Sequence, residues 1–309
     1  MAKTIFKVAG KSNITKAVVI KKGSGFRPQI RSRHPSHSAL RTKLKKMPFR
    51  SVIRLGSTTE IIDTIARGGN RVEINFTEAI KNSADKLRMK KCFTRANVVT
   101  AKWWTTSDGV SFTQHEHNGD TTKTISQLDY PVIAKHRFGS RGRGNTRLEN
   151  QAALTTWLRG KDLNNYIFEK YLNYNREYRL HVTEDGCFYT CRKMLKTETP
   201  KDKRWFRNDS NCVWIVESNP SFNKPTNWSE IVRECVKALN GCNLHVGACD
   251  VRVSSTSTSG VRGNNGPNKF VVIEINSAPS FGEGTEERYL EKLPELLEKQ
   301  RTVQRNNRK

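Results

Sequence analysis

The chain has 309 residues, of which 35% are hydrophobic and 27% charged, and its formal net charge is +26. A chain of this length exceeds what one hydrophobic core usually serves, so we expect two or three packed units. No apolar run approaches the length of a membrane span or of a signal-peptide core, and the seven cysteines include no CxxC pair. The composition argues against a membrane partner and a disulfide-stapled fold, and we expect a soluble, cytoplasmic protein.

The positive charge is concentrated near the amino terminus. Residues 1–50 hold 14 Lys or Arg and no Asp or Glu, which leaves +12 of the +26 for the remainder. Such a field attracts a polyanion, for example nucleic acid or an acidic protein surface, whereas the simpler alternative is a tail that only aids solubility. We expect residues 1–48 to form a flexible basic arm, within which residues 16–26 offer one short strand.

A small strand-helix-strand unit follows the arm. Residues 51–56 and 71–76 have the pattern of strands, and residues 58–69 between them predict a helix that ends at a Gly-Gly pair. Residues 77–96 predict a helix or a helix pair. Asn82 or Ser83 is the expected cap of the second helix, with Lys86 in its first turn.

Residues 98–133 combine short strands with turns and include His115, Glu116 and His117. Two histidines on one face of a strand can bind a metal ion, but two ligands without a third seldom make a site. A solvated loop is therefore the preferred interpretation.

Residues 130–148, YPVIAKHRFGSRGRGNTRL, predict a hairpin with a phosphate-binding flap. Lys135 lies at the end of the first strand, and the loop after it contains three glycines whose backbone N–H groups can approach an anion closely. The spacing matches neither a Walker loop nor the GxGxxG dinucleotide fingerprint. The alternative is an RGRG contact with nucleic acid.

The next part of the chain alternates strands and helices. Residues 151–159 predict a helix, residues 166–171 a strand with Glu169, and residues 178–182 a strand that follows Glu177. Asp185-Gly186 predicts the turn of a hairpin into residues 187–195. A basic segment, a helix over residues 229–239 and a strand over residues 244–253 come next, and a last helix over 285–300 precedes a basic tail.

The strand at residues 270–276, FVVIEIN, carries two oxygen ligands on one face, because strand side chains alternate and Glu274 and Asn276 are two residues apart. A turn-rich loop joins it to the strand that carries Asp250, so a hairpin would place the three side chains together. Carboxylate and amide oxygens suit Mg²⁺, which takes its other ligands from water and phosphate. The alternative is an ordinary strand whose polar residues face water.

The order of these parts resembles the ATP-grasp superfamily, over about residues 85–279. The resemblance rests on Lys86 in an Asp-Lys-Leu context, PVIAK with a Gly-rich flap, FEKY with a following Glu, then Asp250, and EIN before a Pro turn. Within the superfamily it is most similar to the ribosomal-protein glutamate ligase-like branch, because Arg192-Lys193 and Phe206-Arg207-Asn208 resemble that branch's basic strand and FRxN segment. The resemblance implies an α+β fold with two α+β subdomains sandwiching ATP, preceded by a shortened α/β unit and a basic arm.

Carried over position by position, the resemblance implies a site for ATP and Mg²⁺, with Mn²⁺ as the alternative metal. The phosphates would contact Lys86 and Lys135 under a flap of Gly139, Ser140, Gly142 and Gly144. Glu169, with the backbone of Lys170 and Tyr171, would hold adenine, and Glu177 the ribose. Asp250, Glu274 and Asn276 would bind the metal, and Arg192, Lys193, Arg207 and Asn208 would face the reacting phosphoryl group or the acyl substrate.

The sequence also departs from the family. The first domain is shortened, and an arginine that some relatives place two residues before the metal-binding Asp is replaced by Ala248, so Arg252 or Lys193 would have to supply its charge. The expected domains are the arm (1–48), the shortened unit (49–82), the central subdomain with the flap (83–165), the carboxyl-terminal subdomain with the metal site (166–298) and a basic tail (299–309).

The resemblance implies an ADP-forming carboxylate-amine ligase that works through an acyl phosphate. The carboxylate substrate could be an amino acid and the amine acceptor a protein or peptide, and the arm could bind a polyanion. Two alternatives remain open: a nucleic-acid-binding protein that uses the same fold as a scaffold or switch, and a kinase that stops at a phosphorylated product.

Overall fold

A computed structural model gives the structure of the chain, and it describes residues 17–21, 51–56, 58, 72–139, 142–208, 210–254, 269–279 and 284–306. The chain divides into two compact units. The first comprises residues 1–84, 243–248 and 276–309, and the second comprises residues 85–242 and 249–275. The helix expected at 58–69 and the loop expected at 254–268 lie largely outside the described residues, as does the flap residue Ser140.

A three-stranded parallel sheet organises the first unit. Its strands are β1 (Ala17–Lys21), β2 (Ser51–Leu55) and β3 (Val72–Ile74), in that order. The short strand offered by residues 16–26 is therefore present as β1. The helices of this unit are α2 (Thr77–Ala84), which contacts β2, and α6 (Thr285–Asn306), which contacts β3.

Asn75 ties the end of β3 to the start of the strand that carries Asp250. The residue has a positive φ of 60°, and its side-chain amide donates to the carbonyls of Arg54 and Val246 at 3.1 and 2.9 Å. Its side-chain oxygen accepts from the backbone N–H of His245 at 2.8 Å. Asparagine suits this position because it tolerates the left-handed conformation while pairing buried backbone groups.

Residues 77–95 contain a helix pair, α2 and α3, as one of the two readings of residues 77–96 predicted. The second helix, α3, spans Lys86–Arg95, and its cap is Asp85, whose carboxylate accepts from the N–H of Leu87 at 2.9 Å. The prediction that Asn82 or Ser83 caps this helix was wrong, because α2 continues through both residues. Lys86 is the first residue of α3, so the prediction that it lies in the first turn is confirmed.

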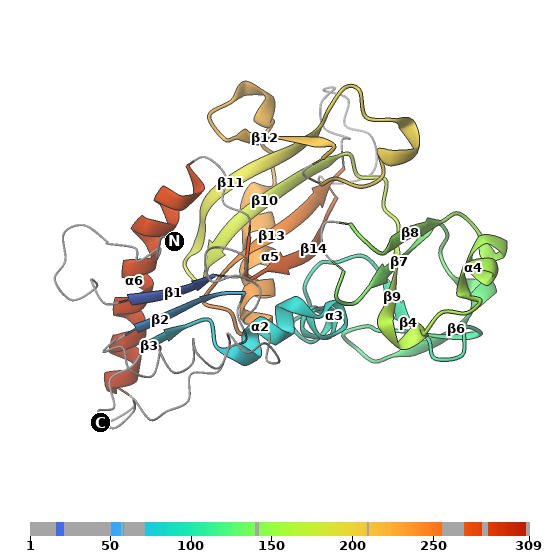
Figure 1. Cartoon of the computed structure of the whole chain (residues 1–309), viewed down its shortest axis with the longest axis horizontal. Helices are drawn as coiled ribbons and strands as arrows, with labels where there is room; N and C mark the ends of the chain where they lie inside the picture. Colours follow the sequence, from blue (N-terminus) through green and yellow to red (C-terminus); the bar gives the residue numbers. More distant parts are fainter. Residues whose placement is uncertain are drawn as a thin grey trace, which may run out of the picture. The chain divides into compact units, whose positions relative to one another are not determined.

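A six-stranded antiparallel sheet forms one end of the second unit (Figure 1). Its order is β6-β5-β4-β9-β7-β8, and all neighbouring strands within it are antiparallel. A buried apolar cluster with Trp104, Phe112 and Phe168 at its centre holds the sheet against α4 (Gln151–Leu158). The strands are β4 (Trp103–Thr105), β5 (Ser111–Gln114), β6 (Thr121–Thr124), β7 (Val132–His136), β8 (Asn145–Leu148) and β9 (Tyr166–Lys170).

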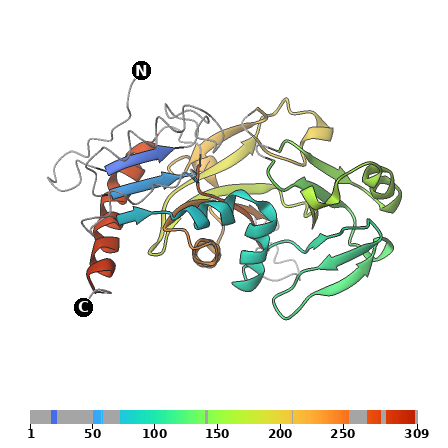
Figure 2. The same ribbon diagram turned by 60° about the horizontal axis from the view of Figure 1, so that its bottom comes forward.

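A five-stranded sheet with the order β12-β11-β10-β13-β14 carries most of the charged residues that were predicted to bind nucleotide, metal or substrate. The turn predicted at Asp185-Gly186 is confirmed, because Thr183 pairs with Gly186 at the closed end of β10 and β11. One face is covered by α5 (Trp228–Gly241), which contacts β10 and β11 (Figures 1 and 2). The strands are β10 (Arg176–Thr183), β11 (Gly186–Leu195), β12 (Cys212–Val216), β13 (Val246–Val253) and β14 (Phe270–Asn276).

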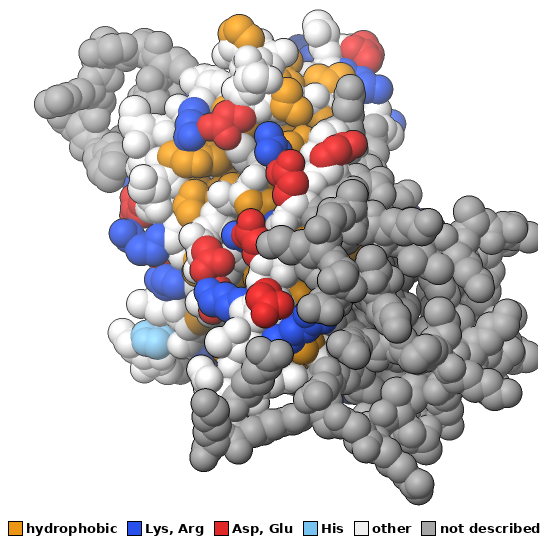
Figure 3. All heavy atoms as spheres, turned by 90° about the vertical axis from the view of Figure 1, so that its left-hand side faces the viewer, with side chains coloured by type: hydrophobic (Ala, Val, Ile, Leu, Met, Phe, Trp, Pro, Cys, Tyr) orange, Lys and Arg blue, Asp and Glu red, His pale blue; other side chains and the backbone are white. Residues whose placement is uncertain are grey.

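The last helix, α6, runs to Asn306 and so extends beyond the predicted end at residue 300. Ion pairs three residues apart stabilise its exposed side, for example Arg288 with Glu291 at 3.0 Å and Lys292 with Glu295 at 2.6 Å. Figure 3 faces the side on which α6 lies in Figure 1 and shows acidic and basic side chains intermixed there. Among the described residues, no helix is both long and apolar enough to cross a membrane.

Candidate functional site

Lys135 and Glu169, both predicted to bind the nucleotide, form an ion pair inside the six-stranded sheet. They come from the adjacent strands β7 and β9, and the Lys135 Nζ lies 2.8 Å from the Glu169 Oε2. Both side chains are buried. Burial alone would raise the pKa of the Glu169 carboxyl, but the charges of Lys135 and Lys90 outweigh it, so the pKa lies below its usual value.

Lys90 is a third member of this cluster that the sequence did not single out. It is fully buried on α3, where its ammonium lies 3.5 Å from the Glu169 Oε1 and donates to the Thr100 hydroxyl at 2.6 Å. Burial lowers the pKa of Lys90 to about 8. The signal that could have found it is the spacing from Lys86, because residues four apart share one face of a helix.

Lys86 directs its ammonium to the flap, where it donates to the carbonyl of Gly139. Burial lowers the pKa of Lys86, and the negative charge of Glu274 on β14 opposes that shift. The side chain therefore lies within electrostatic range of a predicted metal ligand as well as of the flap.

The flap is the turn between β7 and β8, and its glycines are required by its geometry. A Cβ at Gly139 would clash with the carbonyl oxygen of Arg143, and one at Gly144 would lie 2.9 Å from the Cβ of His136. Gly142 has a φ of +74°, and its position for a Cβ lies 3.7 Å from the ring of Phe206. The turn thus contacts the segment that carries Arg207, and Arg137 anchors its base through an ion pair with Asp85, the cap of α3.

The backbone N–H groups of Lys170 and Tyr171 are already used. The Lys170 N–H donates to the carbonyl of Lys102 and the Tyr171 N–H to the carbonyl of Pro131, both at 2.9 Å. The adenine contacts predicted here would therefore have to use carbonyl oxygens or side chains. The guanidinium of Arg147 lies 4.2 Å from the centre of the Tyr171 ring.

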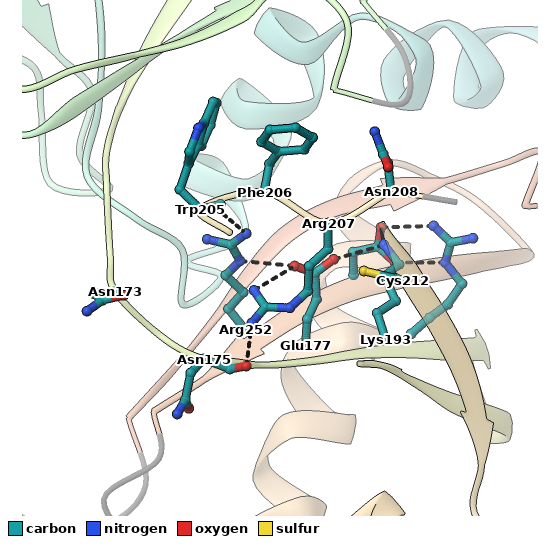
Figure 4. A network of polar contacts seen from close by, with 12 residues as sticks. Asn173, Asn175, Glu177, Lys193, Trp205, Phe206, Arg207, Asn208, Cys212 and Arg252 are labelled. Carbon is teal, nitrogen blue, oxygen red and sulfur yellow. Dashed lines mark hydrogen bonds and ion pairs between the residues drawn. The ribbon is translucent and has the colours of Figure 1, made fainter. Parts of the chain in front are cut away.

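A second buried cluster lies on the five-stranded sheet and joins Glu177, Lys193 and Asp250. Figure 4 labels Glu177 and Lys193. The Lys193 ammonium bridges the two acids, at 2.9 Å from the Glu177 Oε1 and 2.7 Å from the Asp250 Oδ2. Glu177 and Lys193 are directly opposite each other in the pairing of β10 with β11. These three predicted residues, which are separated in the sequence, are thus joined through Lys193.

Three arginines surround the acids of this cluster. Arg179 binds both oxygens of Asp250 at 2.7 and 2.9 Å, and Arg252 binds Glu177 at 3.0 Å. Arg207 lies 3.9 Å from Glu177 and donates to the carbonyl of Asn175. Four cations therefore face two carboxylates, which leaves two positive charges in excess. The Arg207 side chain is only 5% exposed, yet its Nε has no hydrogen-bond partner.

The charges of this cluster hold its acids ionised. Burial opposes ionisation of Asp250, but Arg179 and Lys193 lower the pKa of its carboxyl well below the usual range. The pKa of Glu177 is likewise lowered, because the attraction of Lys193 and Arg252 exceeds the effect of burial. Burial opposes protonation of Lys193, but Asp250 and Glu177 raise its pKa. The cluster is thus a set of fixed charges rather than a proton donor at neutral pH.

Arg179 is the clearest residue that the sequence analysis missed, since it donates to both oxygens of Asp250. A signal was available in the pattern Glu177-Tyr-Arg179, because alternate residues of a strand share a face. The neighbouring strands β10 and β13 then bring Arg179 to Asp250.

Two of the residues predicted to face the phosphoryl group or the acyl substrate, Arg192 and Asn208, do not join this cluster. Arg192 follows the alternation of β11 and so lies on the opposite face from Lys193, where it donates to the carbonyl of Ser221 at 2.6 Å and stacks on Tyr178. The side chain of Asn208 accepts from the N–H groups of Ser210 and Asn211 at 3.0 and 3.2 Å. It orders its own loop and does not contact the acids.

The predicted metal ligands lie on two neighbouring strands, Asp250 on β13 and Glu274 and Asn276 on β14. The backbone N–H of Ser254 donates to the carbonyl of Lys269 at 2.8 Å and closes the base of their connection. Asp250 Oδ1 accepts one hydrogen bond, from Arg179, and so retains a lone pair for a metal. Oxygen donors of this kind fit Mg²⁺, with Asp250 supplying at most one oxygen.

The histidines of residues 115–117 do not form a metal site. His115 contacts the Thr105 hydroxyl at 2.8 Å and Asp120 at 2.9 Å, and His117 contacts the carbonyl of Thr94 at 3.0 Å. Across the described ranges, no group of three or more His, Cys, Asp or Glu side chains is placed to hold a metal ion.

The structure is similar to several solved ligases. A D-alanine–D-alanine ligase from Bacillus anthracis aligns with a TM-score of 0.58 and 13% identity over 89% of this chain and 86% of that chain, and a structure of that ligase complexed with ATP aligns with a TM-score of 0.57. An L-amino acid ligase from Bacillus licheniformis gives 0.55 and 14% identity over 88% of this chain and 62% of that chain. An N5-carboxyaminoimidazole synthase from Aspergillus clavatus, in complex with ADP and 5-aminoimidazole ribonucleotide, gives 0.52 and 16% over 89% and 66%.

These likenesses show the fold. No family model matches the sequence, and no curated protein matches it. The solved structures are ATP-grasp proteins, so the prediction of an ATP-grasp fold is confirmed.

Proposed function

We propose that the protein is an ATP-dependent carboxylate-amine ligase that releases ADP and phosphate. The observation that carries the proposal is the buried cluster of Glu177, Lys193 and Asp250, in which four cations face two carboxylates on a fold shared with ligases. A transferring phosphoryl group needs positive charge around its oxygens and little covalent help from the protein. The two excess positive charges meet that need.

The two buried clusters would have different roles, one in binding the ATP phosphates and the other in binding the ribose and the reacting carboxylate. Lys86 and Lys135 would bind the phosphates of ATP under the flap, while Lys90 stays paired with Glu169, and Glu177 would reach the ribose by exchanging its contact with Arg252 or Arg207. Lys193 and Arg207 would then lie beside the reacting carboxylate. These assignments rest on the ion pairs of the clusters and on the unpartnered Nε of Arg207.

The proposed reaction needs only ATP, the carboxylate substrate and the amine. A carboxylate oxygen attacks the γ-phosphorus of ATP, ADP leaves, and an acyl phosphate forms; an amine then attacks the acyl carbon, and phosphate leaves with that oxygen. Mg²⁺ held by Asp250, Glu274 and Asn276 would supply charge neutralisation when bound. The carboxylate substrate would be an amino acid and the acceptor a protein or peptide.

The test is ADP release from ATP and Mg²⁺ with pools of amino acids, with and without hydroxylamine. Hydroxylamine converts an acyl phosphate into a hydroxamate, so ADP together with a hydroxamate is expected, and the pool that yields it identifies the carboxylate. ATP binding without ADP formation, with every pool and with protein acceptors present, would contradict the ligase and favour a binding protein on the same fold.

We also propose that the basic arm holds a polyanionic acceptor or its carrier, because residues 1–50 carry 14 cations and no acids. Replacing the lysines and arginines of residues 22–48 with glutamine, which leaves β1 and β2 unchanged, should weaken binding to a polyanion such as heparin and reduce its salt dependence, while ATP binding is kept. Unchanged heparin binding by this variant would refute this role.

A further inference from the structure

The edge strand β12 places an exposed tryptophan on the cluster-bearing face of the five-stranded sheet. Trp214 pairs directly with Lys193 of β11, and directly paired residues share a face. Its side chain is 39% exposed, and Val216, two residues further along the same face, is 41% exposed. A large aromatic and an aliphatic side chain therefore remain open to solvent beside buried charges.

The indole also contacts the cations of the cluster. The centre of its ring lies 4.9 Å from the guanidinium carbon of Arg179 and 5.3 Å from the Lys193 ammonium. Arg179 is thus held between Asp250 and Trp214. Part of the Trp214 side chain covers the ion pair, and the exposed part is available to another molecule.

The charged residues beside Trp214 and Val216 indicate which second chemical group a bound molecule would carry. The cluster has two positive charges in excess, and the buried Arg207 has an unpartnered Nε. A ligand that satisfies both features carries a carboxylate for the cations and an apolar or aromatic group for Trp214 and Val216. An amino acid or a short peptide with a large apolar side chain has both groups.

We propose that Trp214 and Val216 form the side-chain subsite for the carboxylate substrate and that this substrate is an amino acid or peptide with an aromatic or large aliphatic side chain. The inference rests on the proposed ligase activity for the fate of the carboxylate. The subsite itself is a statement about binding, so it can be tested without turnover.

The test uses the full-length protein with Mg²⁺ and a non-hydrolysable ATP analogue. Calorimetry measures the dissociation constants of two probes of equal charge, glycyl-L-phenylalanine and glycyl-L-alanine. The wild type is expected to bind the phenylalanine probe at least about tenfold more tightly, the range for burying one large apolar group in a pocket. Trp214→Ala should reduce that preference to less than about threefold and leave the affinity for the alanine probe nearly unchanged.

Val213→Ala is the matched control. Val213 precedes Trp214 on β12 and is 42% exposed, but it lies on the opposite face, so the variant should keep the wild-type preference. Trp214→Leu is a second variant that is less disruptive to the fold, because leucine still covers Arg179 while the aromatic ring is lost. It should lower the preference for the phenylalanine probe by a smaller factor than Trp214→Ala does. Melting temperatures show whether each variant is folded.

Equal affinity for both probes, no binding of either probe, or a preference that survives in folded Trp214→Ala would overturn the subsite. The outcomes that would contradict the ligase proposal are different. Preferential binding of the phenylalanine probe without any hydroxamate would keep the subsite and remove the ligase, whereas hydroxamate formation only from small or acidic carboxylates would do the reverse.

Discussion

Arg179 and Asp250, on the adjacent strands β10 and β13, are joined by two hydrogen bonds of 2.7 and 2.9 Å. Asp250 is buried and Arg179 is largely covered, and Lys193 donates to the same carboxylate at 2.7 Å. Asp250 is therefore kept ionised and fixed in orientation before any ligand arrives. A carboxylate oriented by two cations presents one remaining lone pair in a defined direction.

Removal of Arg179 should destabilise the fold. Arg179→Met leaves Asp250 buried with Lys193 as its remaining cationic partner, and loss of one partner of a buried ion pair costs on the order of 3 kcal/mol. Urea unfolding followed by circular dichroism measures the loss. Lys224→Ala is the control, because its pair with Glu217 is exposed and should contribute less than about 1 kcal/mol. A loss of stability below about 1 kcal/mol in Arg179→Met would contradict this prediction.

Lys90 should make stability depend on pH in the alkaline range. Its pKa is about 8 in the folded chain against 10.5 as the ordinary value, so between these values the unfolded chain binds a proton that the folded chain has lost. Stability therefore rises with pH through this window, by about 2 kcal/mol between pH 7.5 and 10. Urea unfolding of the wild type and of Lys90→Met isolates this contribution as the difference between the two curves. Parallel curves would refute the lowered pKa.

The conformation of Gly142 should matter for ATP and not only for stability. Gly142→Ala forces a residue with a Cβ to adopt a φ of +74°, which costs about 1 kcal/mol, and should weaken ATP binding roughly fivefold. Gly160→Ala is the control, since Gly160 has a φ of +70° and no neighbour within 4 Å. Both variants should lose similar stability, but only Gly142→Ala should change the dissociation constant for ATP. Equal ATP affinities in the two variants would remove the flap from the site.

Glu274 should be required for turnover. Glu274→Ala removes a hard oxygen ligand, and because charge stabilisation by a metal is worth several kcal/mol, ADP formation should fall at least ~100-fold. Initial rates at several Mg²⁺ concentrations separate weaker metal binding from slower chemistry. Near-normal rates at low Mg²⁺ would exclude Glu274 as a ligand.

Much of the fold could be predicted because its strands have strong local patterns. The Asp185-Gly186 turn, the β7–β8 hairpin and β14 were each predicted from a few adjacent residues, and all are present. The cap of α3 was misplaced because Asn82 and Ser83 are good caps in isolation, whereas Asp85 gains an additional ion pair with Arg137, which is distant in the sequence.

Short sequence patterns pointed to several residues of the two buried clusters, whereas residues whose contacts cross strands were missed. Lys135, Glu169, Glu177 and Asp250 all lie in the buried clusters. Arg179 and Lys90 contact those acids through the pairing of distant segments, which one sequence does not show. Arg192 was assigned with Lys193, although neighbouring residues of a strand face opposite ways.

The central claim is that a carboxylate oxygen passes to phosphate through an acyl phosphate. The direct measurement uses substrate labelled with ¹⁸O in its carboxylate, ATP, Mg²⁺ and an amine, followed by mass spectrometry of the inorganic phosphate. Amide formation with one ¹⁸O in each phosphate is the result that this account predicts. Unlabelled phosphate, or label in AMP, would contradict it.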